Sequence, residues 1–205
     1  MKVGLYGGSF DPVHLGHLLI AEAAKECLGL EEIRWIPAAQ SPLKVERPRA
    51  TNEQRLTMLR LALDGTKGHH IDDRELLRGE RSYTLTTVDQ IVNENPDDEF
   101  YLIIGADSLA SMGQWHKPSD LLNLVTLAVV ARGGENAPDY GVLRGIVSDD
   151  RVQLFKNSQV AMPQIELSSS EIRDRIKDGR SIRFRLPRAV EAFMRSEKLY
   201  LGEEA

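Results

Sequence analysis

The segment GGSFDPVHLGH, at residues 7–17, combines glycines, two histidines and the start of a predicted helix. It follows a short apolar run, Val3 to Tyr6, and precedes a Leu- and Ala-rich stretch with helical spacing, so it predicts a strand-to-helix turn. Small residues there let the backbone approach a ligand closely, and a helix start offers unpaired N–H groups to an anion. Because His14 and His17 are three residues apart, both can lie on one face of the opening turn and stabilise charge on a phosphate.

Each of these features also has a simpler interpretation. A Gly-Gly pair after a strand is often an ordinary turn, and an H-x-x-H pair can be part of a metal site. Zinc takes three or four protein ligands, and no third ligand stands near His14 and His17 at a suitable spacing. We therefore predict no metal held by the protein.

Serines and an arginine form a second candidate phosphate site in LSSSEIR, at residues 167–173. Serines just before a helix can cap its open N–H groups, which is a purely structural role. The same serines, with an arginine one turn further on, can also bind phosphate at the helix N-terminus. The residues alone leave both roles open.

The first segment closely resembles the G-x-F-x-P-x-H-x-G-H signature of the nucleotidyltransferase superfamily related to class I aminoacyl-tRNA synthetases. Every fixed position of that signature is matched, by Gly8, Phe10, Pro12, His14, Gly16 and His17. The second segment resembles the superfamily motif I-S-x-T-x-I-R, which binds the β- and γ-phosphates. It is matched by Ser168, Ile172 and Arg173, with Leu167 in place of Ile and Ser170 in place of Thr.

The resemblance implies an ATP site built from both segments. In this superfamily the first motif holds the triphosphate, and its histidines stabilise the region of the transferring α-phosphate. His14 and His17 would accordingly be the catalytic residues. The residues expected to bind ATP from these two segments are Gly8, Ser9, Phe10, Ser168, Ser170 and Arg173.

Three further segments are similar to those of the bacterial nicotinate mononucleotide adenylyltransferases. They are GADSL at 105–109 with Trp115 shortly beyond it, SYTLTT at 82–87, and SPLK at 41–44. The similarity extends over essentially the whole chain. It implies a reaction of ATP with nicotinate mononucleotide that gives nicotinate adenine dinucleotide and pyrophosphate, as in NAD biosynthesis.

The same resemblance implies roles for five more residues. Trp115 would stack on the nicotinate ring, Thr84 would help bind that ring, and Lys44 would reach a phosphate. Gly105 and Asp107 would line the nucleotide site. Each has a structural alternative, because a tryptophan can serve the core, a loop lysine is usually solvated, and aspartate readily caps a helix.

The implied chemistry needs neither a general base nor an enzyme nucleophile, because the attacking phosphate is already anionic. Catalysis then consists of aligning two polyanions and stabilising charge. The sequence shows no carboxylate cluster, so Mg²⁺ is expected to arrive with ATP. The alternatives are a phosphopantetheine adenylyltransferase, which shares both phosphate motifs, a cytidylyltransferase, a relative of the tRNA synthetases, and a non-catalytic nucleotide sensor.

The elements that must position these residues follow the pattern of an α/β fold. Apolar runs at 3–6, 33–36, 100–104 and 126–131 alternate with helical stretches at 17–29, 51–64 and 84–94. Continuous apolar strands predict a doubly wound, mainly parallel sheet, a Rossmann-like nucleotidyltransferase fold. A small helical portion at 167–200 would follow the sheet within one domain spanning 1–205. Residues 133–150 lack periodicity and predict a variable surface excursion.

Composition limits the classes of protein to consider. The 205 residues carry 26 basic and 31 acidic side chains, a net charge of −5, which argues against a nucleic-acid partner. A single cysteine, Cys27, excludes a disulfide framework. No apolar run approaches the roughly 18 residues of a membrane span, and the start lacks a signal-peptide core. We expect a cytoplasmic protein with ATP and nicotinate mononucleotide as partners and no membrane, and the sequence leaves a homo-oligomer open.

Overall fold

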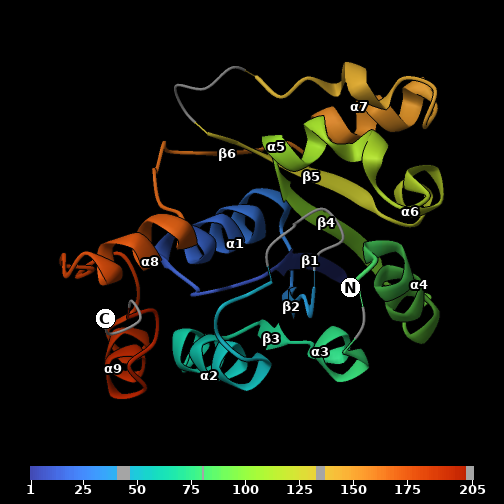
Figure 1. Ribbon diagram of the computed structural model, residues 1–205. Helices are drawn as coiled ribbons and strands as arrows, with labels where there is room; N and C mark the ends of the chain where they lie inside the picture. The colour runs from blue at the N-terminus through green and yellow to red at the C-terminus, as the bar shows by residue number, and fades with distance from the viewer. Residues whose placement is uncertain (41–46, 80, 133–136, 202–205) are drawn as a thin grey trace.

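A computed structural model describes residues 1–40, 47–79, 81–132 and 137–201. Within them, six parallel strands form one sheet in the order β3-β2-β1-β4-β5-β6 (Figure 1). The strands are β1 (Lys2–Gly8), β2 (Glu32–Pro37), β3 (His69–Ile71), β4 (Glu99–Gly105), β5 (Thr126–Arg132) and β6 (Val160–Met162). The strand order reverses between β1 and β4. In doubly wound sheets, ligands bind at the carboxyl ends of the strands on either side of such a reversal.

Helices cover both faces of the sheet (Figure 1). One face carries α1 (Leu15–Leu28), α2 (Asn52–Leu63), α8 (Ser169–Lys177) and α9 (Arg188–Ser196). The other carries α4 (Thr84–Glu94), α5 (Ala106–Ala110), α6 (Pro118–Leu124) and α7 (Asp149–Asn157). The short α3 (Arg74–Arg78) follows β3, and 3₁₀ turns occur at η1 (Met112–Gln114) and η2 (Tyr140–Leu143). The predicted α/β class and parallel sheet are confirmed.

The apolar cores on the two faces explain why the strands are continuously apolar. Side chains alternate along β1, so Val3 and Leu5 join one cluster while Tyr6 joins the other. Because both faces are covered by helices, neither set can be polar. The strand is thereby fixed between two packed layers, and its carboxyl end, which leads into residues 7–17, is held in place.

Local signals for helix ends are accurate. The capping box of Thr51 and Gln54 opens α2, with each side chain accepting a backbone N–H of the other. Gly29 ends α1 in the left-handed conformation, with φ 62°. The helix at 84–94 stands where the sequence predicts it, and α8 and α9 lie within the helical portion predicted at 167–200.

The expectation for residues 133–150 is wrong in part. Tyr140 and Leu143 are buried and pack in the cluster on the α4 face. Two inward side chains in a single 3₁₀ turn produce no recognisable period, so the pattern looks like a surface loop. No helix in the described ranges is long and apolar enough to cross a membrane.

Candidate functional site

A cavity of about 410 Å³ lies beyond the carboxyl end of β1. Its lining contains Gly8, Ser9, Phe10, Asp11, His17, Arg47, Pro48, Arg49, Ser169 and Arg173. Both motif segments therefore contribute to one hollow, although they are more than 150 residues apart in the chain. Three arginines against one carboxylate give the cavity a positive charge, which suits a polyphosphate.

The two histidines lie together at the start of α1. His14 is the N-cap residue, and its ring stacks on that of His17 with 3.7 Å between ring centroids. The backbone N–H of His14 donates to Nδ1 of His17 at 3.2 Å. A neutral His17 therefore carries its proton on Nε2. His17 lines the cavity, whereas His14 is almost completely buried.

Gly16 leaves room for this stacked pair. A Cβ at residue 16 would stand 3.0 Å from Nδ1 of His14, which is closer than ordinary van der Waals contact. The glycine of the H-x-G-H element therefore makes room for an imidazole ring.

The aromatic rings of Tyr6, Phe10 and Trp35 pack together against His17 of the first motif. Phe10 is buried, and its ring lies 5.6 Å from Tyr6, 5.4 Å from Trp35 and 5.1 Å from His17 between centroids. Its backbone has φ 47°, a left-handed conformation that a non-glycine residue keeps only where packing holds it. Phe10 thus borders the cavity chiefly as a support for the loop and for His17.

His69 supports these rings from β3. The indole N–H of Trp35 donates to Nδ1 of His69 at 3.0 Å, and Nε2 of His69 lies 2.9 Å from Glu22. The side chain of His69 is 3% exposed, and burial lowers its pKa below the ordinary 6.5, although Glu22 opposes the shift. A protonated His69 would direct an N–H at the N–H of Trp35, so the neutral form fits this site.

The native protein should therefore lose stability as the pH falls below about 6.5, because the unfolded chain binds a proton there that the folded chain resists. Urea unfolding followed by circular dichroism, from about pH 7.5 to about pH 5, should show a steeper loss for the native protein than for His69→Gln. The glutamine amide can accept from Trp35 and donate to Glu22 without titrating. Equal pH dependence of the two proteins would contradict the assignment.

The sequence leaves two roles open for the serines of the second motif, which are capping of a helix and binding of phosphate, and different serines are placed for each role. Ser168 caps α8 by accepting the N–H of Glu171 at 3.1 Å, and the hydroxyls of Ser168 and Ser170 lie 3.0 Å apart. Ser169, which lies between the two serines of the motif, lines the cavity and donates to the carbonyl of Pro12 at 2.9 Å.

Arg173 connects the two motifs directly. Its Nη1 donates to the backbone carbonyl of Asp11 at 2.7 Å and lies 3.9 Å from the Asp11 carboxylate. Arg173 also lines the cavity, as expected for a phosphate-binding residue. Of the residues expected to bind ATP, Gly8, Ser9, Phe10 and Arg173 line this hollow.

Sequence reasoning missed Asp11, Arg47 and Arg49. Asp11 stands at a variable position of the recognised signature, which gave no reason to select it. The two arginines come from RPR at 47–49, a short basic stretch without a motif. Asp11 accepts the backbone N–H groups of Arg49 and Ala50 at 2.8 and 3.1 Å, so the first motif itself holds this stretch at the cavity.

The other predicted residues lie outside that lining. Gly105 ends β4, the strand beside β1, and Asp107 is exposed in the first turn of α5 without capping it. Thr84 is the first residue of α4, and Trp115 follows η1, partly buried against the cluster on that face. Lys44 lies outside the described residues.

One contact joins the two segments expected to bind the mononucleotide. The rings of Tyr83 and His116 lie 4.7 Å apart between centroids. Tyr83 immediately precedes Thr84, and His116 immediately follows Trp115. The structure thus places the Thr84 and Trp115 segments side by side.

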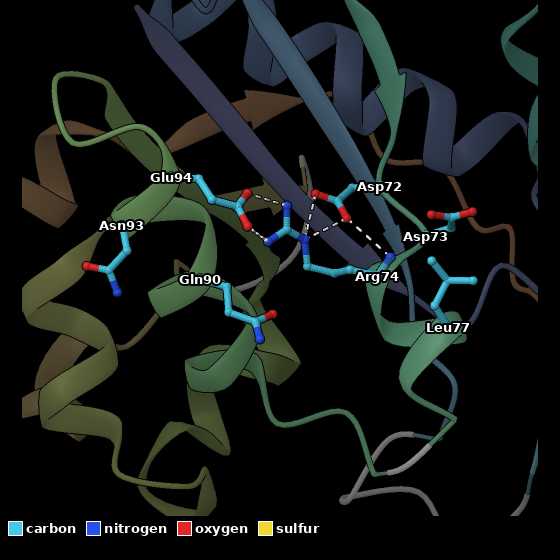
Figure 2. Close-up of a pocket in the computed structure, with 7 residues that line it drawn as sticks. All are labelled: Asp72, Asp73, Arg74, Leu77, Gln90, Asn93 and Glu94. Carbon is cyan, nitrogen blue, oxygen red and sulfur yellow. Dashed lines mark hydrogen bonds and ion pairs between the residues drawn. The ribbon is translucent and has the colours of Figure 1, made fainter.

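A larger, open hollow of about 660 Å³ lies between α3 and α4 (Figure 2). Figure 2 shows Arg74 between Asp72 and Glu94, which it contacts at 2.7 and 2.9 Å. These two carboxylates neutralise its charge, and none of the motif residues lines the hollow. The candidate active site is therefore the smaller cavity at β1.

The chain matches the cytidylyltransferase-like family model over residues 5–175. It is 54% identical to a relative from Rhodopirellula baltica, over 97% of this chain and 92% of the relative, named as a probable nicotinate-nucleotide adenylyltransferase. A relative of the same name from Gemmatimonas aurantiaca is 39% identical, over 98% of this chain and 92% of the relative.

A solved structure is similar in fold. The Plasmodium falciparum nicotinic acid mononucleotide adenylyltransferase complexed with NaAD has a TM-score of 0.74 at 17% identity, over 97% of each chain. The two relatives match almost the whole chain, and the family model includes both motifs that line the cavity. This chain belongs to the cytidylyltransferase-like family and, within it, to the nicotinate-nucleotide adenylyltransferases.

Proposed function

We propose that this protein transfers the adenylyl group of ATP to nicotinate mononucleotide at the cavity beyond β1, giving nicotinate adenine dinucleotide and pyrophosphate. The observation that carries the proposal is the convergence of His17 and Arg173 on one cavity, because the two residues belong to the two separate phosphate motifs. Family membership makes the chain a nucleotidyltransferase of NAD biosynthesis.

The reaction needs one bond to form and one to break. An oxygen of the mononucleotide phosphate attacks the α-phosphorus of ATP, and the bond from that phosphorus to the bridging oxygen of the β-phosphate breaks. The attacking oxygen is already anionic, so no proton has to be removed. The protein's contribution is to hold two polyanions in line and to stabilise the charge that develops.

The residues divide this work by position. In this proposal His17, which lines the cavity, supplies its Nε2–H to the transferring phosphate, and His14 fixes the orientation of His17 through the stacked ring and the backbone N–H. Arg173, Ser169 and the stretch 47–49 supply cations and donors for the β- and γ-phosphates. We assign Gly105 and Asp107 to the nucleotide, and Thr84, Trp115 and Lys44 to the mononucleotide.

The described side chains do not form a metal site of their own. They contain no group of three or more His, Cys, Asp or Glu residues that could hold a metal ion. Asp11, the carboxylate in the cavity lining, already accepts the N–H groups of Arg49 and Ala50. We propose that Mg²⁺ enters as part of the MgATP substrate. We also propose that the enzyme is a single domain that works in the cytoplasm.

Substrate competition tests the proposal. Purified protein with MgATP should be offered nicotinate mononucleotide, nicotinamide mononucleotide and phosphopantetheine separately, and pyrophosphate release followed. Nicotinate mononucleotide should give the highest kcat/KM, because Trp115 and the turn at 82–84 suit an acidic pyridine ring. A higher value with phosphopantetheine would overturn the substrate assignment. The absence of turnover with all three would favour a nucleotide sensor.

A further inference from the structure

Asp11 is a buried carboxylate at which three distant parts of the chain meet. It is 4% exposed and accepts the backbone N–H groups of Arg49 and Ala50. The hydroxyl of Tyr200 donates to its Oδ1 at 2.6 Å, from 189 residues further along the chain. Arg173 approaches its Oδ2 at 3.9 Å. The same group therefore contacts the basic stretch, α8 and the segment that follows α9.

Tyr200 is held firmly in this position. The N–H of Leu199 donates to the carbonyl of Met194 at 2.9 Å, and both Leu199 and Tyr200 pack against the cluster under α1 and α2. The backbone of Tyr200 has φ 62°, a left-handed conformation that a tyrosine keeps only where its surroundings impose it. Burial and the Asp11 carboxylate raise the pKa of the hydroxyl, so it remains a donor at neutral pH.

A bound triphosphate would compete with the Asp11 carboxylate for the guanidinium of Arg173. At 3.9 Å, the contact between Arg173 and the carboxylate is longer than a hydrogen bond, whereas Arg173 donates to the backbone carbonyl of Asp11 at 2.7 Å. Oδ1 accepts the Tyr200 hydroxyl and the N–H of Ala50, while Oδ2, the oxygen nearer to Arg173, accepts the N–H of Arg49. The tyrosine hydroxyl thus satisfies a charge that would otherwise draw Arg173 towards it.

We propose that Tyr200 is a positioning residue of the phosphate site, whose hydroxyl helps to satisfy the charge of the Asp11 carboxylate and so leaves Arg173 available to the triphosphate of ATP. The inference rests on the proposed function, because it takes Arg173 to be a triphosphate ligand. Tyr200 itself does not line the cavity, so it acts through the other two residues.

Removing only the hydroxyl tests this role. In Tyr200→Phe, Kd for MgATP, measured by calorimetry without mononucleotide, should rise about 5- to 20-fold. That is at or below the lower end of the range for losing a hydrogen bond to a charged group, because the effect is indirect. KM for the mononucleotide should change by less than about twofold, since that substrate does not depend on Arg173.

Two comparisons separate positioning from general stability. Tyr140→Phe is the matched control, because it removes a buried tyrosine hydroxyl that contacts Gln159 at 3.5 Å on the other face of the sheet. It should leave Kd for MgATP unchanged. In an Arg173→Met background, Tyr200→Phe should add almost nothing, because the arginine that it protects is gone.

Three results would overturn the positioning role of Tyr200. Unchanged ATP binding in Tyr200→Phe, an equal loss in the Arg173→Met background, or unfolding of Tyr200→Phe at the assay temperature overturns the proposal. Failure of the native protein to turn over nicotinate mononucleotide would instead refute the proposed function. The binding measurement does not depend on turnover, so it would still test Tyr200.

Discussion

Replacing His17 by alanine should lower the rate constant of adenylyl transfer by about 10²–10³, the cost of losing one preorganised donor to a transition state. The donor is preorganised because Nδ1 of His17 accepts the N–H of His14, which places the proton on Nε2. Contacts with the rings of Phe10 and Tyr6 hold the imidazole in place. Binding of MgATP should change much less than turnover, because the charge to be stabilised develops during the reaction.

The His17→Ala protein should still fold, because His17 is partly exposed at a helix start and is not in the core. Pre-steady-state measurement of the chemical step, together with a melting curve, checks both expectations. His70→Ala is the matched control, because His70 is an exposed histidine on β3 away from the cavity. Near-normal turnover in His17→Ala would remove this histidine from the mechanism, and an unfolded variant would indicate a structural role.

Replacing Trp115 by alanine should raise KM for the mononucleotide by about 5- to 150-fold, the equivalent of losing one aromatic stacking contact of about 1–3 kcal/mol. The pyridine ring lies away from the reacting phosphate, so the contact is similar in the ground and transition states. Turnover at saturation and KM for ATP should therefore change little. Steady-state kinetics with each substrate varied in turn measures all three quantities.

The packing of Trp115 calls for a second variant. Its side chain is partly buried against the cluster on the α4 face, so alanine should also cost some stability. Trp115→Phe keeps a ring for both contacts and should recover part of the affinity together with most of the stability. If Trp115→Ala weakens ATP as much as the mononucleotide, general packing is the better explanation.

The sequence predicts the architecture well where periodic or continuous apolar signals are long. The apolar runs at 100–104 and 126–131 became β4 and β5, and the helix predicted at 84–94 has those bounds in the structure. The strands β3 and β6 were not predicted, since each has three residues and no distinctive composition. Such short edge strands depend on the neighbouring strand more than on their own residues.

Motifs locate the site, but they do not reveal how it is assembled. The signature selects His17 and the second motif selects Arg173, and both line the cavity. The signature does not select Asp11, whose function depends on contacts with residues 38 to 189 positions away. Partners at such separations are set by the sheet order and by helix packing, which leave no local trace in the sequence.

The chain contains two tryptophans, and they stand on opposite faces of the sheet. Trp35 is fully buried under α1 and α2, while Trp115 packs against the cluster under α4. In a Trp115→Phe protein, all indole fluorescence comes from Trp35, in the cluster under α1 and α2. In a Trp35→Phe protein, it comes from Trp115, against the cluster under α4. The emission of these two proteins during denaturation therefore reports whether the two apolar layers unfold together as one cooperative unit or one after the other.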